Sequence, residues 1–153
     1  MMREEVYFPT HPSQKNDLYI SQYYRLNIQP NTIMKLRYVS DIHLEFIKPN
    51  KLQNILKHMV QKEDEILILA GDIGNPYSEN YYNFMKHINQ EFKKTFVIAG
   101  NHEYYGKYSM ENTKNHMKEY FQQHPNISFL ENQIEKYNGV NFLGTTLWSH
   151  ISK

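Results

Sequence analysis

Metal-capable side chains follow three apolar runs of this sequence, each at the point where the run ends. Asp41 and His43 come directly after the first run, and Asp72 follows the second. Asn101 and His102 follow the third, immediately after a glycine. Carboxylate, imidazole and amide groups are ligands that proteins offer to hard and borderline divalent cations. The pattern therefore predicts that these side chains form a site for a divalent metal ion.

One reaction that such a set can support is displacement at a phosphoryl group. The carboxylate of an aspartate is short and can bridge two ions, and two ions about 3.5–4 Å apart can hold an in-line displacement at phosphorus. The chain contains no cysteine, which excludes disulfides and thiolate ligands. Oxygen and nitrogen ligands of this kind suit several first-row metals, so the pattern leaves the identity of the metal open.

The strands that precede these side chains must position them. Four short apolar runs are typical of buried strands: residues 35–40, 65–70, 95–99 and 127–130. Apolar residues recur at helical spacing between the runs, and Ser78 and Ser109 are suitable N-caps for the second and third helices. The alternation of strand and helix predicts right-handed βαβ units and a mostly parallel sheet with flanking helices. In such α/β sheets, ligands bind at the edge formed by the carboxyl ends of the strands.

Local features of the sequence add detail to this picture. Side chains two residues apart in an extended segment point to the same side, so Asp41 and His43 are expected to face one point. Asn138-Gly139, between apolar runs at 134–137 and 140–143, is the strongest hairpin signal in the chain. Glu103 is expected to support the loop after the third strand rather than to take part in chemistry.

The composition limits the class of protein. The chain has 153 residues, of which 40% are hydrophobic and 22% charged, so one packed domain is feasible. A formal net charge of +1 gives no strong signal for nucleic acid or for a membrane surface. No apolar run reaches the length of a membrane span and the N-terminus does not read as a secretory signal, so we expect a cytoplasmic location.

The first 33 residues differ from the rest of the chain. Pro9, Pro12 and Pro30 interrupt this segment, and only brief apolar alternation around residues 18–28 points to a short strand. We therefore expect residues 1–33 to be a poorly ordered or weakly structured extension. The domain that carries the metal-capable residues is expected to cover residues 34–153.

Three motifs resemble those of a known family. In order, spacing and placement after strands, Ser40-Asp41-Ile42-His43, Gly71-Asp72 and Gly100-Asn101-His102-Glu103 are similar to the first three motifs of the calcineurin-like metallophosphoesterases. Gly144-Thr145-Thr146-Leu147-Trp148 resembles a strand segment found in one bacterial and viral branch of that family. The resemblance covers Met34 to about Ser149. It implies the α/β fold of that family, an αββα sandwich, and hydrolysis of a phosphate monoester or diester at a site with two metal ions.

The resemblance also implies a role for each residue of the motifs. Asp41 and His43 would bind the first ion, Asp72 would bridge both ions, and Asn101 would bind the second. His102 would be the catalytic residue beside the phosphate ester, where it protonates the leaving group or stabilises charge on the phosphoryl oxygens. The ions would be divalent Mn, Fe, Zn or a similar metal.

The sequence departs from the family in its last part. The family supplies further histidine ligands from a lone His after a strand and from a Gly-His-x-His motif, and this chain contains neither. His150 stands in neither context, so we transfer no role to it. The simplest interpretation is a C-terminally truncated domain, the N-terminal part of a longer enzyme, in which much of the second sheet is absent.

Two alternatives to an enzyme that is complete in itself follow from this departure. The first is a catalytically inactive fragment or binding module that retains part of the metal site. The second is an oligomer in which another chain supplies the histidines. In either case the unpaired sheet edge and uncovered face would favour self-association or docking on a partner.

Overall fold

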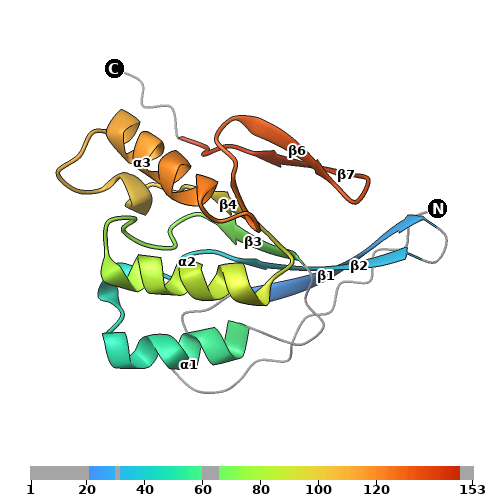
Figure 1. The fold of residues 1–153 in the computed structure, drawn as a ribbon, viewed down its shortest axis with the longest axis horizontal. Helices are drawn as coiled ribbons and strands as arrows, with labels where there is room; N and C mark the ends of the chain where they lie inside the picture. The colour runs from blue at the N-terminus through green and yellow to red at the C-terminus, as the bar shows by residue number, and fades with distance from the viewer. Residues whose placement is uncertain (1–20, 30–31, 60–65, 149–153) are drawn as a thin grey trace.

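Strands and helices alternate along the chain (Figure 1). The computed structural model describes residues 21–29, 32–59 and 66–148. Its elements are β1 (Ser21–Gln29), β2 (Thr32–Val39), α1 (Pro49–Met59), β3 (Ile66–Ala70), α2 (Glu79–Glu91), β4 (Lys94–Ile98), α3 (Met110–Gln122), β5 (Ile127–Phe129), β6 (Gln133–Tyr137) and β7 (Val140–Gly144). Two short 3₁₀ helices, η1 (Leu44–Phe46) and η2 (His102–Tyr104), follow β2 and β4.

The main sheet has five strands in the order β1-β2-β3-β4-β5. Strands β2 to β5 are parallel, and β1 pairs with β2 in the antiparallel direction. The sequence-based prediction of an α/β fold with a mostly parallel sheet and flanking helices is therefore confirmed. Because each crossover steps the same way across the sheet and is right-handed, the three helices are expected on one face.

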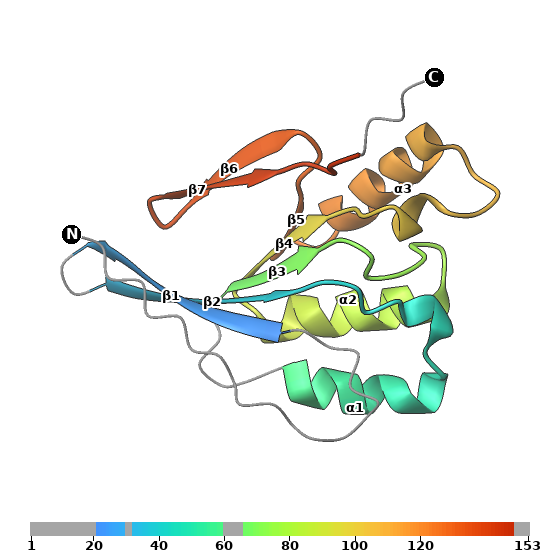
Figure 2. The same cartoon turned by 180° about the vertical axis from the view of Figure 1, so that it is seen from behind.

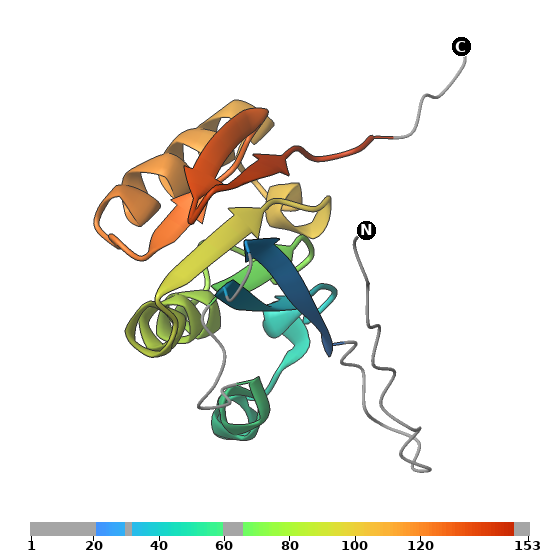
Figure 3. The same ribbon diagram turned by 90° about the vertical axis from the view of Figure 1, so that its right-hand side faces the viewer.

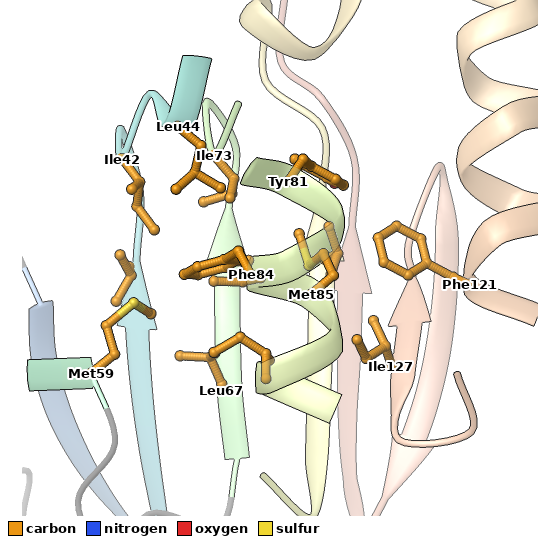
Figure 4. Packing of buried hydrophobic residues seen from close by; sticks show 14 of the residues in the cluster. Ile42, Leu44, Met59, Leu67, Ile73, Tyr81, Phe84, Met85, Phe121 and Ile127 are labelled. Carbon is orange, nitrogen blue, oxygen red and sulfur yellow. The ribbon is translucent and has the colours of Figure 1, made fainter. Parts of the chain in front are cut away.

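The helices do cover one face of the sheet, as Figure 3 shows from the end of the β1–β2 hairpin. Alternate strand residues such as Leu67 and Leu69 of β3 point to this face and join a buried cluster with side chains from α1, α2 and α3. Figure 4 shows Phe84 and Met85 of α2 at the centre of that cluster, with Phe121 of α3 beside them. Ser78 and Ser109 cap α2 and α3, because each hydroxyl accepts a hydrogen bond from a backbone N–H in the first turn.

The hairpin formed by β6 and β7 covers part of the opposite face (Figure 2). Its Phe142 stacks on Phe96 of β4 with ring centroids 4.1 Å apart, and Ile66 of β3 belongs to the same buried cluster. Asn138 and Gly139 both have positive φ, 48° and 83°, as a tight two-residue turn requires. The hairpin predicted from Asn138-Gly139 is thus confirmed.

The described residues extend the sheet before the predicted start of the domain. Strand β1 lies within residues 1–33 and pairs with β2 over almost its whole length. Residues 1–20 and 149–153 lie outside the described parts of the chain, and the domain boundary at residue 34 stays a prediction. No helix in the described ranges has the length and apolar character needed to cross a membrane.

Candidate metal centre

The loops after β2 and β3 run side by side and are joined by backbone hydrogen bonds. Asp41 N–H donates to the carbonyl oxygen of Gly71 over 3.1 Å, and His43 N–H donates to that of Asp72 over 3.0 Å. Leu44 N–H donates to the carbonyl oxygen of Ile73 over 2.9 Å. These bonds continue the sheet beyond its last strand residues. They hold the first two predicted ligand groups next to the third.

All five metal-capable residues lie where β2, β3 and β4 end. We call this set, Asp41, His43, Asp72, Asn101 and His102, the metal edge. Ligand atoms of Asp41, His43 and Asp72 lie within 4.8 Å of one another, and His43 Nε2 is 4.0 Å from Asp41 Oδ1. Asn101 directly precedes η2, and its Nδ2 donates a 2.6 Å hydrogen bond to the Tyr105 hydroxyl. The metal-binding roles of these residues stay predictions.

The backbone at three of these residues is in the left-handed region. The φ angles are 57° at Asp41, 52° at His43 and 53° at Asp72, so the expectation of an extended Asp41–His43 segment was wrong. The side chains of Asp41 and His43 nevertheless lie close together, because the backbone has positive φ at both residues. Non-glycine residues seldom adopt this conformation, and such strain gathers at functional sites. Only two other described non-glycine residues share it, and both are asparagines.

Glu103 holds the loops after β3 and β4 together. Its side chain is buried, and its carboxylate accepts hydrogen bonds from the backbone N–H groups of Asp72, Ile73, Gly74 and Gly100 at 2.7 to 3.3 Å. Burial raises the pKa of the Glu103 carboxyl, while the N–H groups of Gly100, Ile73 and Gly74 act to lower it. The expectation that Glu103 supports the loop is confirmed.

His102 is fixed through both its backbone and its ring. Its backbone N–H donates to Asp72 Oδ1 over 2.8 Å, and its Nδ1 lies 2.9 Å from Oε1 of Glu45. The His43 ring lies edge-on to the His102 ring with centroids 4.3 Å apart, and His43 Nδ1 is 3.4 Å from the same Glu45 oxygen. The catalytic role of His102 stays a prediction.

Sequence analysis missed Glu45. It lies in η1, two residues after His43, and an acidic residue so close to the end of the first strand is the signal that could have drawn attention to it. His43, Glu45 and His102 also bring ligand atoms within 4.8 Å of one another, so His43 belongs to two candidate ligand groups.

The residues present fit a divalent cation in both chemistry and space. The ligand atoms are carboxylate oxygens and imidazole nitrogens, the donors that such ions prefer. Gly100 stands against the Asp72 carboxylate, and a Cβ atom at this position would overlap it. Glycine at position 100 thus keeps space around the carboxylate that is predicted to bridge two ions.

A pocket of about 660 Å³ adjoins the metal edge. Asn101, Tyr105 and Trp148 are among the residues that line it. The segment after β7 is held there by a 2.6 Å hydrogen bond from Thr146 Oγ1 to the carbonyl oxygen of Ala99. The pocket therefore has aromatic side chains within reach of one predicted ligand.

Comparison with known proteins agrees with this geometry. Residues 34–151 match the family model of the calcineurin-like phosphoesterases. The chain is also 37% identical over 127 residues to the uncharacterized protein L509 of Acanthamoeba polyphaga mimivirus. That alignment covers 77% of this chain and 45% of the viral protein, so the chain spans less than half the length of this curated relative.

Proposed function

Because this chain belongs to the calcineurin-like phosphoesterase family, we propose that it hydrolyses a phosphate ester with the help of divalent metal ions. The observation that carries the proposal is the meeting of Asp41, His43 and Asp72 at the ends of two neighbouring strands, each with strained backbone. Strain of this kind persists only where the surroundings enforce it.

Each residue of the metal edge has a distinct task in this proposal. Asp41 and His43 would hold one ion, Asp72 would contribute its carboxylate to both ions, and Asn101 would hold the second. The Tyr105 hydroxyl accepts from Asn101 Nδ2, which leaves the amide oxygen of Asn101 as the atom offered to a cation. When bound, the ions supply Lewis-acid stabilisation of the negative charge on the phosphoryl group.

His102 acts on the leaving group. The hydrogen bond from its backbone N–H to Asp72 Oδ1 ties its position to that of the bridging carboxylate. A protonated imidazole beside the reacting phosphoryl group can give a proton to the departing oxygen, which would otherwise leave as a charged and poorer leaving group. Loss of His102 should therefore lower kcat most for esters whose leaving group is a strong base.

The pocket beside Asn101 receives the organic part of the ester. Tyr105 and Trp148 are 60% and 53% exposed and line this pocket, so they offer apolar ring surface to a substrate. The substrate is thus a phosphate monoester or diester with an apolar or aromatic substituent. Trp148→Ala is expected to raise KM for such an ester with little change in kcat.

The test is turnover of p-nitrophenyl phosphate and bis(p-nitrophenyl) phosphate in the presence of Mn²⁺, together with elemental analysis of the purified chain. Asp72→Asn should lose both metal and turnover, whereas Glu119→Gln, a change at an exposed acid on α3, should lose neither. The preferred ester distinguishes a monoesterase from a diesterase. Turnover that survives Asp72→Asn would overturn the proposal.

A second candidate, a binding module without catalysis, is favoured by exposed apolar side chains on the β6–β7 hairpin. Ile134 and Leu143 are cross-strand partners and are 67% and 71% exposed. An exposed apolar pair on the hairpin gives a surface on which another molecule, including a second copy of the chain, can pack. Light scattering across a concentration series would show self-association that Ile134→Ser weakens. A monomer at every concentration would speak against self-association.

A further inference from the structure

We propose that Glu45 is a positioning residue that orients both histidines of the metal edge through one carboxylate oxygen. Its Oε1 lies 2.9 Å from Nδ1 of His102 and 3.4 Å from Nδ1 of His43. An ionised carboxylate only accepts hydrogen bonds, so the proton in each contact belongs to Nδ1 of the ring. In the neutral rings Nε2 is then the nitrogen with a free lone pair.

Glu45 is itself held in place by neighbouring elements. Asn80 of α2 donates from Nδ2 to the carbonyl oxygens of Leu44 and Ile47 at 3.0 and 2.7 Å, which fixes η1 on both sides of Glu45. Leu44 is fully buried. The backbone that carries the Glu45 carboxylate is therefore anchored beside the histidines.

The second carboxylate oxygen of Glu45 adds a cost to its position beside the histidines. Glu45 Oε2 is buried and has no hydrogen-bond partner among the described residues. A Cβ added at Gly74 would come within 3.0 Å of it, so the carboxylate fills the available space closely. A buried oxygen without a partner costs free energy. This cost is explained if the other oxygen, Oε1, orients the two histidines.

The consequence for chemistry rests on the proposed function. With both Nδ1 atoms turned to Glu45, the Nε2 lone pair of His43 is free for an ion. His102 donates to the leaving-group oxygen from Nε2–H of its doubly protonated ring, which becomes the neutral Nδ1–H form when that proton is transferred. Metal-bound histidines commonly give their other N–H to a carboxylate, and removal of that carboxylate typically weakens metal binding 10–100-fold. The competing interpretation makes Glu45 a metal ligand together with His43 and His102.

The first experiment records the tautomers of the two rings by long-range ¹H–¹⁵N NMR of the full, metal-free chain, at a pH above the imidazole range. The tautomer of a histidine is set by the hydrogen bond that its other nitrogen makes. We expect Nδ1–H at His43 and His102 in the wild type, loss of that form in Glu45→Ala, and no change in Glu119→Ala. A wild-type proton on Nε2, or unchanged tautomers in Glu45→Ala, would overturn the proposal.

The second experiment titrates Zn²⁺ into the same proteins by calorimetry. Glu45→Ala should weaken Zn²⁺ binding 10–100-fold without changing the number of ions bound, and Glu45→Gln, whose amide oxygen still accepts one N–H, should weaken it less. Loss of one whole ion in Glu45→Ala would make Glu45 a ligand and refute the positioning role. Because the NMR experiment needs neither metal nor turnover, it decides this proposal even if the proposed function fails.

Discussion

Replacement of Glu103 by Gln tests whether the loops of the metal edge are held by one buried carboxylate. Oε1 accepts from the N–H groups of Ile73 and Gly74, and Oε2 accepts from those of Asp72 and Gly100. Glutamine has a single oxygen, and its NH₂ group would face two of these donors. Two buried N–H groups would therefore lose their acceptor.

The expected loss of stability follows from this count. A buried donor without an acceptor costs about 1–3 kcal/mol, so two cost roughly 2–6 kcal/mol. The substitution also removes a buried charge, which offsets part of this loss of stability because burial disfavours the ionised carboxylate. We expect Glu103→Gln to destabilise the fold by about 3 kcal/mol, which is a large part of the 5–15 kcal/mol of a typical domain.

Urea unfolding followed by circular dichroism measures this effect. With an m-value near 2 kcal/mol/M, a loss of about 3 kcal/mol moves the midpoint down by about 1.5 M. Glu103→Ala should be at least as damaging, because all four N–H groups lose their acceptor, and Glu119→Gln is the matched control. If Glu103→Gln and Glu103→Ala were both as stable as the wild type or more stable, the buried carboxylate would not stabilise the fold, and this reasoning would be refuted.

Three further predictions concern the support of the site. Burial acts to raise the pKa of Glu135, but hydrogen bonds from Lys94, 2.6 Å away, and from Ser128, together with the charge of Lys94, bring it below the usual value near 4.5. The pair therefore stabilises the fold above about pH 4.5 and stops doing so as the pH falls through the lowered pKa. Glu135→Gln should accordingly lower the free energy of unfolding by at most about 1 kcal/mol at pH 7, because Glu135 is partly exposed. Near pH 2 it should have no effect. Urea titrations at the two pH values measure both. Phe142→Ala removes the ring that stacks on Phe96 and should cost about 3 kcal/mol, measured as a lower urea midpoint; a loss below about 1 kcal/mol would mean that the hairpin adds little to the core. Ser109→Ala removes the hydroxyl that caps α3 and should cost about 1 kcal/mol by the same method, with Ser109→Asp close to the wild type; equal losses in both variants would contradict a capping role.

The sequence predicts those parts of this fold that depend on local chemistry. Ser78 and Ser109 mark the starts of α2 and α3 because a hydroxyl at the N-cap satisfies a backbone N–H of the first turn, whatever the helix packs against. Asn138-Gly139 marks the hairpin because few other pairs tolerate positive φ twice in succession. The parallel order of the strands follows from alternation with helices.

Features of the site that depend on contacts between distant residues were not predictable in the same way. Glu45 has no motif of its own, and its contact with His102 joins residues 57 positions apart. The four N–H groups bound by Glu103 come from two loops about 30 residues apart, so the sequence could suggest a supporting role but not its partners. Periodicity and capping rules carry no information about such pairs.

The left-handed backbone at Asp41, His43 and Asp72 explains both the failed expectation and the character of the site. In a strand that continued past residue 40, side chains would alternate between the two faces of the sheet. Asp41 and His43 would then be close only because they lie on the same face. The chain instead turns at each of these residues, at a cost of about 1–2 kcal/mol per residue. The hydrogen bonds between the loops after β2 and β3, together with the Glu103 carboxylate, resist relaxation of these turns. The predicted ligand groups are therefore set in position by the protein itself, and the conformational cost of assembling them belongs to folding.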